Sequence, residues 1–276
     1  MYPLFKSLWK AYWFLFCGGS LIAFLLLSNL IRQSNDGFLL IWLIWTICYF
    51  GYIYIVSTAL NIIAVKKIGL TVDTLNNCKA KDFTDIYESF QKQIVKNPKR
   101  FNRLGKVLVL VNLSTGYLTQ GDYQSAKVIL EKIPRPKDKE NSVKAVYANN
   151  WCDYYLGVND LEQAQKCFEN FHQLLENKAI LKSEFIDAYE IIKVEISIAR
   201  GDYEDVEATL KMLLKNAKNL LREVSCHFKL SQVYIYENRF DEARDMLEFV
   251  IKNGGDTRYV NQAQVLLKQI NGVNID

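Results

Sequence analysis

The chain carries few side chains that could do chemistry. It has two histidines and six cysteines among 276 residues. There is no HExxH zinc motif, no glycine-rich loop that could hold a phosphate before a helix, and no Gly-x-Ser-x-Gly turn that could present a nucleophile. Adjacent residues of a helix point about 100° apart, so Cys226 and His227 cannot form a thiol–imidazole pair. We therefore expect no enzyme, and neither cofactor, metal site nor small-molecule substrate is indicated.

The cysteines are scattered along the chain, and no two of them have CxxC spacing. Single cysteines at helical core positions are typical of proteins in a reducing compartment. Packing also accounts for Cys152 and His227, which lie in apolar surroundings of expected helices.

One segment concentrates positive charge, although the whole chain has a formal net charge of only +4. Six basic residues and no acidic residue lie between Glu88 and Asp122, namely Lys92, Lys96, Lys99, Arg100, Arg103 and Lys106. A solvated helix face is one interpretation. The other is that Lys96, Lys99, Arg100 and Arg103 contact anionic lipid headgroups. Nucleic acid is not an expected partner, because Phe101 is the single aromatic residue interleaved with these cations.

Two long uncharged runs precede this segment. The first has 21 residues between Lys10 and Arg32, and the second has 29 residues between Asp36 and Lys66. About 20 apolar residues are enough for a helix to cross a bilayer, so we expect two transmembrane helices at about 11–31 and 37–65. The first run is too long for a cleaved signal peptide, whose apolar core has about 7–15 residues. Residues 1–66 are thus predicted to be a membrane anchor.

The basic residues around these runs predict their orientation. Cations lie before the first run and after the second, at Lys6, Lys10, Lys66 and Lys67. Since Lys and Arg favour the cytoplasmic side, we expect an integral protein of the cell membrane with both termini and the following region in the cytoplasm. Neither run has an ionisable side chain other than cysteine, so an anchor is favoured over a transporter.

Residues 67–106 are expected to form helices next to the membrane. Phe83, Ile86, Phe90 and Ile94 mark one apolar helical face, and Pro98 ends that helix. Whether this stretch is a degenerate copy of the repeat that follows stays open.

From residue 107 onward, one local pattern recurs. The sequence LSTGYLTQGDYQSAKVILEKI at 113–133 predicts a helix, a left-handed turn at Gly121 and a second helix capped by Asp122. The pattern returns with Asn159, Gly201 and Asn238 at the turn, and asparagine is the next best residue for that backbone. The turn residues are 38, 42 and 37 positions apart.

Such periods predict an α-solenoid of antiparallel helix pairs. The expected fold class is all-α: a two-helix transmembrane hairpin followed by this solenoid over residues 107–276. The last apolar pattern is expected to form a capping helix, with Tyr259, Ala263, Leu266, Leu267 and Ile270 on its buried face.

These repeats resemble the tetratricopeptide repeat (TPR) family over about two-thirds of the chain. The family pattern has a large residue, Leu, a small residue and Tyr in its first helix, and Ala with a large residue in its second. Three copies match it, with Leu110, Leu113, Ser114, Tyr117, Ala126 and Leu130; Ala148, Trp151, Cys152, Tyr155, Ala164 and Phe168; and His227, Leu230, Ser231, Tyr234, Ala243 and Leu247. The third copy departs at Lys193, Val194, Ser197 and Val206.

The resemblance implies a concave groove lined by first-helix residues. Its members here would be Thr115, Asn149, Asp153, Glu195, Phe228, Gln232 and Tyr236. Asp153 and Glu195 hold equivalent positions in successive copies, which would place two carboxylates on one wall. That wall would suit a basic or amide-rich peptide, and a solvated polar face is the alternative.

Two functions follow as expectations. The first is a membrane-anchored scaffold that mediates protein–protein interaction at the cytoplasmic face. The alternative is a regulatory receptor that binds a short peptide in the groove. In both, the partner is a protein or peptide.

Overall fold

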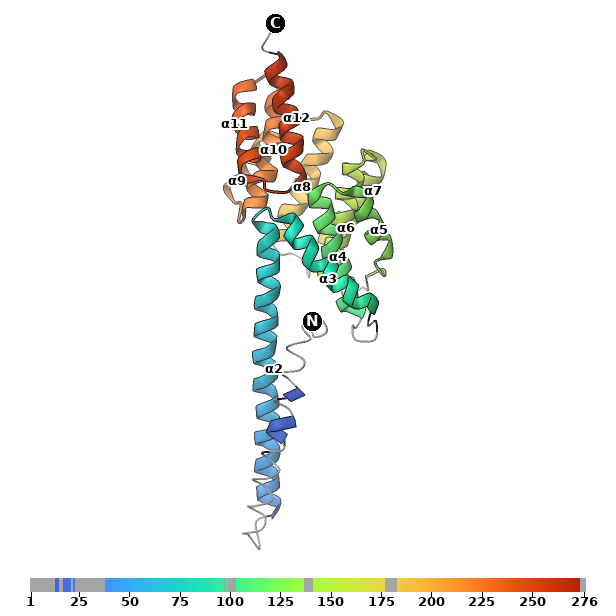
Figure 1. Ribbon diagram of the computed structural model, residues 1–276. Helices are drawn as coiled ribbons and strands as arrows, with labels where there is room; N and C mark the ends of the chain where they lie inside the picture. Colours follow the sequence, from blue (N-terminus) through green and yellow to red (C-terminus); the bar gives the residue numbers. More distant parts are fainter. Residues whose placement is uncertain are drawn as a thin grey trace. The chain divides into compact units, whose positions relative to one another are not determined.

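The computed structural model describes residues 13–14, 17–20, 22, 38–96, 98, 103–136, 141–176 and 183–273. Regular structure in these ranges is helical and includes no strand, which confirms the all-α class. The helices shown in Figure 1 are α2 (Phe38–Asn76), α3 (Ala80–Lys96), α4 (Arg103–Gln120), α5 (Tyr123–Lys132), α6 (Asn141–Gly157), α7 (Leu161–Glu176), α8 (Ser183–Arg200), α9 (Val206–Lys215), α10 (Leu220–Tyr236), α11 (Phe240–Asn253) and α12 (Arg258–Val273). The chain divides into two compact units, residues 1–70 with 97–105 and residues 71–96 with 106–276.

The predicted transmembrane hairpin is not found. Within the described part of the chain, no helix is both long enough and apolar enough to cross a membrane. Most of the first run, at about 11–31, lies outside the described residues, and the second run is one part of a helix that continues to Asn76 through the polar residues Asp73 and Thr74. The uncharged runs therefore did not predict the helix bounds. The predictions of two transmembrane spans and of an integral membrane protein with cytoplasmic repeats are wrong.

In the first unit, the segment at residues 17–20 lies against α2. The hydroxyl oxygens of Ser20 and Tyr49 are 3.2 Å apart. A Cβ at Gly19 would lie 2.7 Å from the Tyr52 ring, so glycine allows this close approach without a shift of that ring.

In the second unit, the four predicted turns have the expected backbone. Gly121, Asn159, Gly201 and Asn238 have positive φ angles of 81°, 60°, 74° and 59°. At each turn, the N–H of the following residue donates to a carbonyl five positions earlier, at Tyr117, Tyr155, Ser197 and Tyr234, over 2.8–2.9 Å. The predicted cap is also present, because the Asp122 carboxylate accepts the Ser125 N–H at 3.0 Å. The backbone conformation of the four turns and the helix cap at Asp122 are therefore as the sequence predicts.

Small residues lie where the paired helices approach each other. Ala126 on α5 and Ala164 on α7 are fully buried. We expect Ala126→Leu and Ala164→Leu each to lower the free energy of unfolding by about 1–3 kcal/mol, because the added methylenes have no space. Urea unfolding followed by circular dichroism measures this loss. Val128→Leu is the matched control on α5, since Val128 is 48% exposed, and equal losses at 126 and 128 would contradict the helix register.

The third hairpin differs from the others, in agreement with its divergent sequence. Its second helix, α9, begins only at Val206, after Asp205 with a φ of 59°. The Asp202 carboxylate accepts the Glu204 N–H at 3.3 Å instead of capping α9. Val206 thus stands at the start of α9, where a residue larger than alanine can be accommodated.

Helix α3 packs on α4 in the second unit. The Gln120 side-chain amide donates to the Thr84 hydroxyl at 2.5 Å, and a Cβ at Gly116 would collide with that hydroxyl. The Tyr117 hydroxyl donates to the Glu88 carboxylate at 2.6 Å. Residues 80–96 therefore belong to the same packed body as the repeats.

The Tyr117–Glu88 bond gives this contact a pH dependence. The bond holds the pKa of Glu88 below its usual range. A carboxyl with a lowered folded-state pKa contributes stability above its unfolded pKa, about 4.3, and loses it as the pH falls through the folded value. We expect Tyr117→Phe to cost about 1 kcal/mol at pH 7, because the carboxylate is partly solvated, and less as the pH falls below about 4. Urea titrations at both pH values check this, and a cost that does not fall would refute the assignment.

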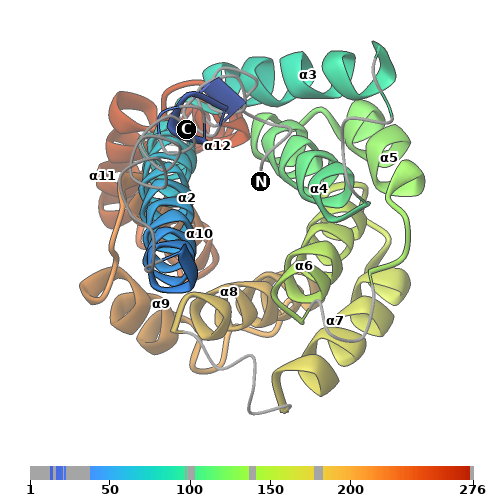
Figure 2. The ribbon, with the colours of Figure 1, turned by 90° about the horizontal axis from the view of Figure 1, so that it is seen from below.

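The second unit closes on itself, as Figure 2 shows, with α4, α6, α8 and α10 on the inner side and α5, α7, α9 and α11 on the outer side. The closing contact joins the start of α3 to the turn between α11 and α12. The Asp256 carboxylate accepts the N–H groups of Ala80 and Lys81 at 2.5 and 2.7 Å. The Asp256 N–H donates to the Cys78 carbonyl at 3.2 Å.

Gly255 makes that closing turn feasible. Its φ is +56°, and a Cβ there would collide with the Cys78 carbonyl oxygen. The helices from α5 to α12 contact their neighbours in the series, α3 bonds α4, and α4 packs on α5, so we refer to α3–α12 as the helical ring.

Candidate functional site

A layer of paired charges crosses the interior of the helical ring. The Arg258 guanidinium, at the start of α12, donates to both Asp153 carboxylate oxygens at 2.6 and 3.1 Å and to the Leu118 carbonyl at 3.0 Å. The Lys229 ammonium lies 2.7 Å from the Glu195 carboxylate. Arg258 and Glu195 are 3.9 Å apart and link the two pairs. We refer to these four residues as the ion layer.

The ion layer is nearly closed to solvent. Side-chain exposure is 2% for Lys229, 11% for Arg258, 16% for Glu195 and 19% for Asp153. Burial by itself lowers the pKa of Lys229, but the Glu195 carboxylate and Tyr259 together raise the pKa above its usual range. At Arg258, burial likewise lowers the pKa and the Asp153 carboxylate raises it. The pKa of Arg258 is raised well above its usual range. Both cations are therefore charged, and each carboxylate has a partner.

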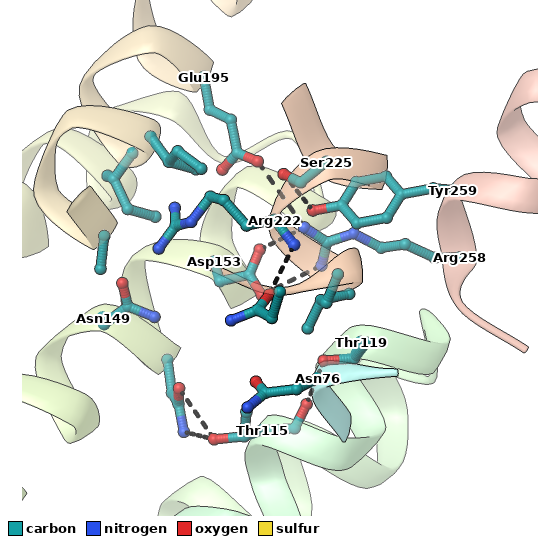
Figure 3. Close-up of a pocket in the computed structure, with 16 residues that line it drawn as sticks. Asn76, Thr115, Thr119, Asn149, Asp153, Glu195, Arg222, Ser225, Arg258 and Tyr259 are labelled. Carbon is teal, nitrogen blue, oxygen red and sulfur yellow. Dashed lines mark hydrogen bonds and ion pairs between the residues drawn. The ribbon is translucent and has the colours of Figure 1, made fainter. Parts of the chain in front are cut away.

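Cavity A lies on one side of this layer and has a volume of about 240 Å³ (Figure 3). On α6, α8 and α10 its other lining residues precede those of the ion layer in sequence. Most are polar, and they include Asn76, Thr115, Thr119, Asn149, Asn219 and Arg222.

The polar wall of cavity A is held by a buried amide. Asn150 is 1% exposed, and its amide donates to the Val111 carbonyl at 3.1 Å and the Ser114 hydroxyl at 3.0 Å. It also bonds the Thr115 hydroxyl at 2.9 Å, which joins α6 to α4.

Cavity B lies on the other side of the layer and has a volume of about 340 Å³. Its lining residues follow the layer in sequence on α6 and α8, whereas on α10 they lie on both sides of Lys229. They include the aromatic rings of Tyr123, Phe228 and Tyr259 and the amides of Asn159, Gln232 and Gln262. The two cavities share Glu195, Arg258 and Tyr259, so the ion layer separates them.

The structure brings six of the seven predicted groove residues to this interior. Thr115, Asn149 and Asp153 line cavity A, Phe228 and Gln232 line cavity B, and Glu195 lines both. Tyr236 is not among them. It is 60% exposed and stacks on Tyr203 with ring centroids 4.0 Å apart. Whether the six bind a ligand stays a prediction.

The sequence interpretation missed the cations of the ion layer. Lys229 lies between Phe228 and Leu230 on α10 and stands 34 positions after Glu195, which is a signal of pairing that the sequence offers. Arg258 offers no such signal, since it is one basic residue at the start of a helix. Its role depends on ring closure, which brings it to Asp153 across 105 positions.

The structure describes only part of the basic segment. Lys96 ends α3 and Arg103 begins α4, whereas Lys99 and Arg100 lie outside the described residues. Contact with lipid headgroups stays a prediction.

The histidine and cysteine side chains serve packing. The His227 ring stacks on Phe249 at 3.9 Å and bonds the Glu223 carbonyl at 2.8 Å. Burial raises the pKa of the Cys78 thiol to about 11 and that of Cys226 above its usual value. Across the described ranges, no group of three His, Cys, Asp or Glu residues could hold a metal ion.

Comparison with known proteins finds no match for this chain. No family model, no curated protein and no solved structure matches the chain.

Proposed function

We propose that the helical ring is a protein-interaction module that binds a short peptide segment of a partner protein in cavity B. The observation that carries this proposal is a set of side-chain amides that bond no other described residue. The side chains of Asn159, Gln232 and Gln262 line the cavity and make no hydrogen bond to another described residue. A side-chain amide has both donors and an acceptor, as a peptide group does, so the two pair well.

Aromatic rings beside these amides supply apolar contact area. Tyr123, Phe228 and Tyr259 line the same cavity. Aromatic side chains are enriched among the residues that carry most binding energy at protein interfaces. Cavity B thus combines hydrogen-bonding groups for a backbone with rings for one or two side chains.

The acidic wall expected from the sequence is not available for a basic peptide. Asp153 and Glu195 are already paired with Arg258 and Lys229. An amide-rich segment is therefore the better occupant. A closed interior also favours the receptor hypothesis over a scaffold with a long open groove. The resemblance of the repeats to TPR sequences supports a binding role in general.

The proposal is tested by photo-crosslinking from cavity B. A small diazirine side chain is placed at position 262 of the full chain, and an identical one at position 128 on the exposed face of α5 serves as control. Irradiation in an extract of the source cells should join one protein to position 262 and not to position 128. Sequencing the attached peptide should identify a contiguous short segment. Equal crosslinking from both positions, or none from position 262, would rule out cavity B.

A binding measurement then follows with the identified peptide. We expect Gln232→Ala to weaken its binding about 3- to 10-fold, as the loss of one hydrogen bond predicts. Gln165→Ala on the outer helix α7 should leave the affinity unchanged, because Gln165 bonds Glu169 and Arg200 outside the cavity.

A further inference from the structure

Cavity A retains one positive charge that no described carboxylate neutralises. Its lining has the cations Arg222 and Arg258 and the anions Asp153 and Glu195. Within the ion layer, each anion has its own cation, since Lys229 pairs with Glu195. Arg222 is therefore left over. Its recorded side-chain contact is a hydrogen bond from one terminal nitrogen to the Asp187 carbonyl at 3.2 Å, and no described carboxylate lies within 4.0 Å.

Two amides beside Arg222 also lack partners. The side chains of Asn76 and Asn149 line cavity A and make no hydrogen bond to another residue that the structure describes. Figure 3 shows the side chains of Asn76, Asn149 and Arg222 around one space. They belong to α2, α6 and α10, respectively. A guanidinium carries five N–H donors and each amide carries two. The cavity therefore presents an excess of donors.

The end of a helix adds to this potential. Arg222 lies in the first turn of α10, whose cap Asn219 also lines the cavity and accepts the Arg222 N–H at 2.9 Å. The N-terminus of a helix carries a partial positive charge. It reinforces the charge of the guanidinium at the same place.

We propose that cavity A binds a small oxyanion, a carboxylate or a phosphate group, held by the Arg222 guanidinium with the amides of Asn149 and Asn76. The planar guanidinium presents parallel donors that match two oxygens of either group. The volume of about 240 Å³ lies below the range of about 300–1,000 Å³ for drug-sized ligands, so the ligand is small. This site is separate from the peptide site proposed for cavity B.

The test is isothermal titration of the full chain with inorganic phosphate and, separately, with sodium succinate. Sodium chloride keeps the ionic strength constant, and a chloride titration serves as blank. We expect saturable binding of at least one of the two anions, and which of them binds more tightly distinguishes phosphate from carboxylate. Arg222→Gln should weaken that binding about 10- to 100-fold, as loss of a charged hydrogen-bond pair predicts.

Three variants make the result specific to the site. Arg244→Gln removes a cation that bonds Asp241 on the surface of α11, and it should bind as the parent does. Arg222→Lys keeps the charge without the planar fork, so its affinity should lie between those of the parent and Arg222→Gln. Asn149→Leu should weaken binding with all charges in place. Melting curves without ligand establish that each variant is folded.

The outcomes are distinct. Absence of saturable binding by both anions, or equal binding by Arg222→Gln and Arg244→Gln, would overturn the proposal. Photo-crosslinking at position 262 is independent of this result, because it reports on cavity B, so the two proposals can fail separately.

Discussion

Arg258→Met should destabilise the helical ring by about 3 kcal/mol at pH 7. The substitution removes the partner of Asp153 and leaves a carboxylate that is 81% shielded without a cation on that side. Breaking a buried pair from one side costs about 3–5 kcal/mol, and the remaining solvent contact of Asp153 places this case at the lower end. Urea unfolding of the full chain, followed by circular dichroism, gives the value.

Two further variants separate the charge effect from packing. Asp153→Asn combined with Arg258→Met removes both charges, and its stability should return to within about 1 kcal/mol of the parent. Arg244→Met should change stability by less than about 1 kcal/mol, because its partner Asp241 is 93% exposed. If the double variant is as unstable as Arg258→Met alone, the loss comes from packing and the ion layer is not what stabilises the interior.

Phe83→Ala should have a similar or larger effect, about 3–5 kcal/mol. Phe83 is 1% exposed on α3, its ring centroid lies 4.7 Å from that of Tyr87, and it packs beside Gly116 of α4. Truncation to alanine leaves a cavity where α3 meets the repeats. The same urea titration measures the loss for the full chain.

Val95→Ala is the control on α3, since Val95 is 76% exposed and should cost less than about 0.5 kcal/mol. A loss below about 1 kcal/mol for Phe83→Ala would mean that α3 is not part of the packed ring. The sequence left open whether this region is a degenerate repeat, and this result decides only whether α3 packs on the repeats.

Local features of the repeats could be predicted from the sequence because short-range chemistry determines them. Gly121 and Asn159 take the left-handed backbone that few other residues tolerate, and Asp122 caps the helix that follows it. Buried small residues such as Ala126 and Ala164 follow from the same repeat pattern. Each of these predictions needs only residues a few positions apart.

Closure of the ring could not be predicted in this way. It depends on contacts such as Asp256 with Ala80, which are 176 positions apart. Without closure, Asp153 and Glu195 look like an open acidic wall. With closure, Arg258 and Lys229 neutralise them, and the site moves to the two cavities on either side.

The membrane prediction failed for another reason. It relied on the absence of charged residues over two long runs. That absence is a property of the composition and does not determine where a helix begins or ends. Helix α2 does not end with its uncharged run but continues to Asn76, whose side chain lines cavity A. Among the helices of the described ranges, none meets the length and apolarity needed to cross a membrane.

The central claim, that the start of α3 meets the turn before α12, is tested most directly at Gly255. Its φ is +56°, and a Cβ there would collide with the Cys78 carbonyl oxygen across the closing contact. Gly201 is the matched control, because its φ is +74° and a Cβ there would meet no atom within 4 Å. Alanine strains the left-handed backbone at both positions, so closure predicts that Gly255→Ala lowers the free energy of unfolding of the full chain by at least about 1 kcal/mol more than Gly201→Ala does. Equal losses for the two variants in urea unfolding would contradict it.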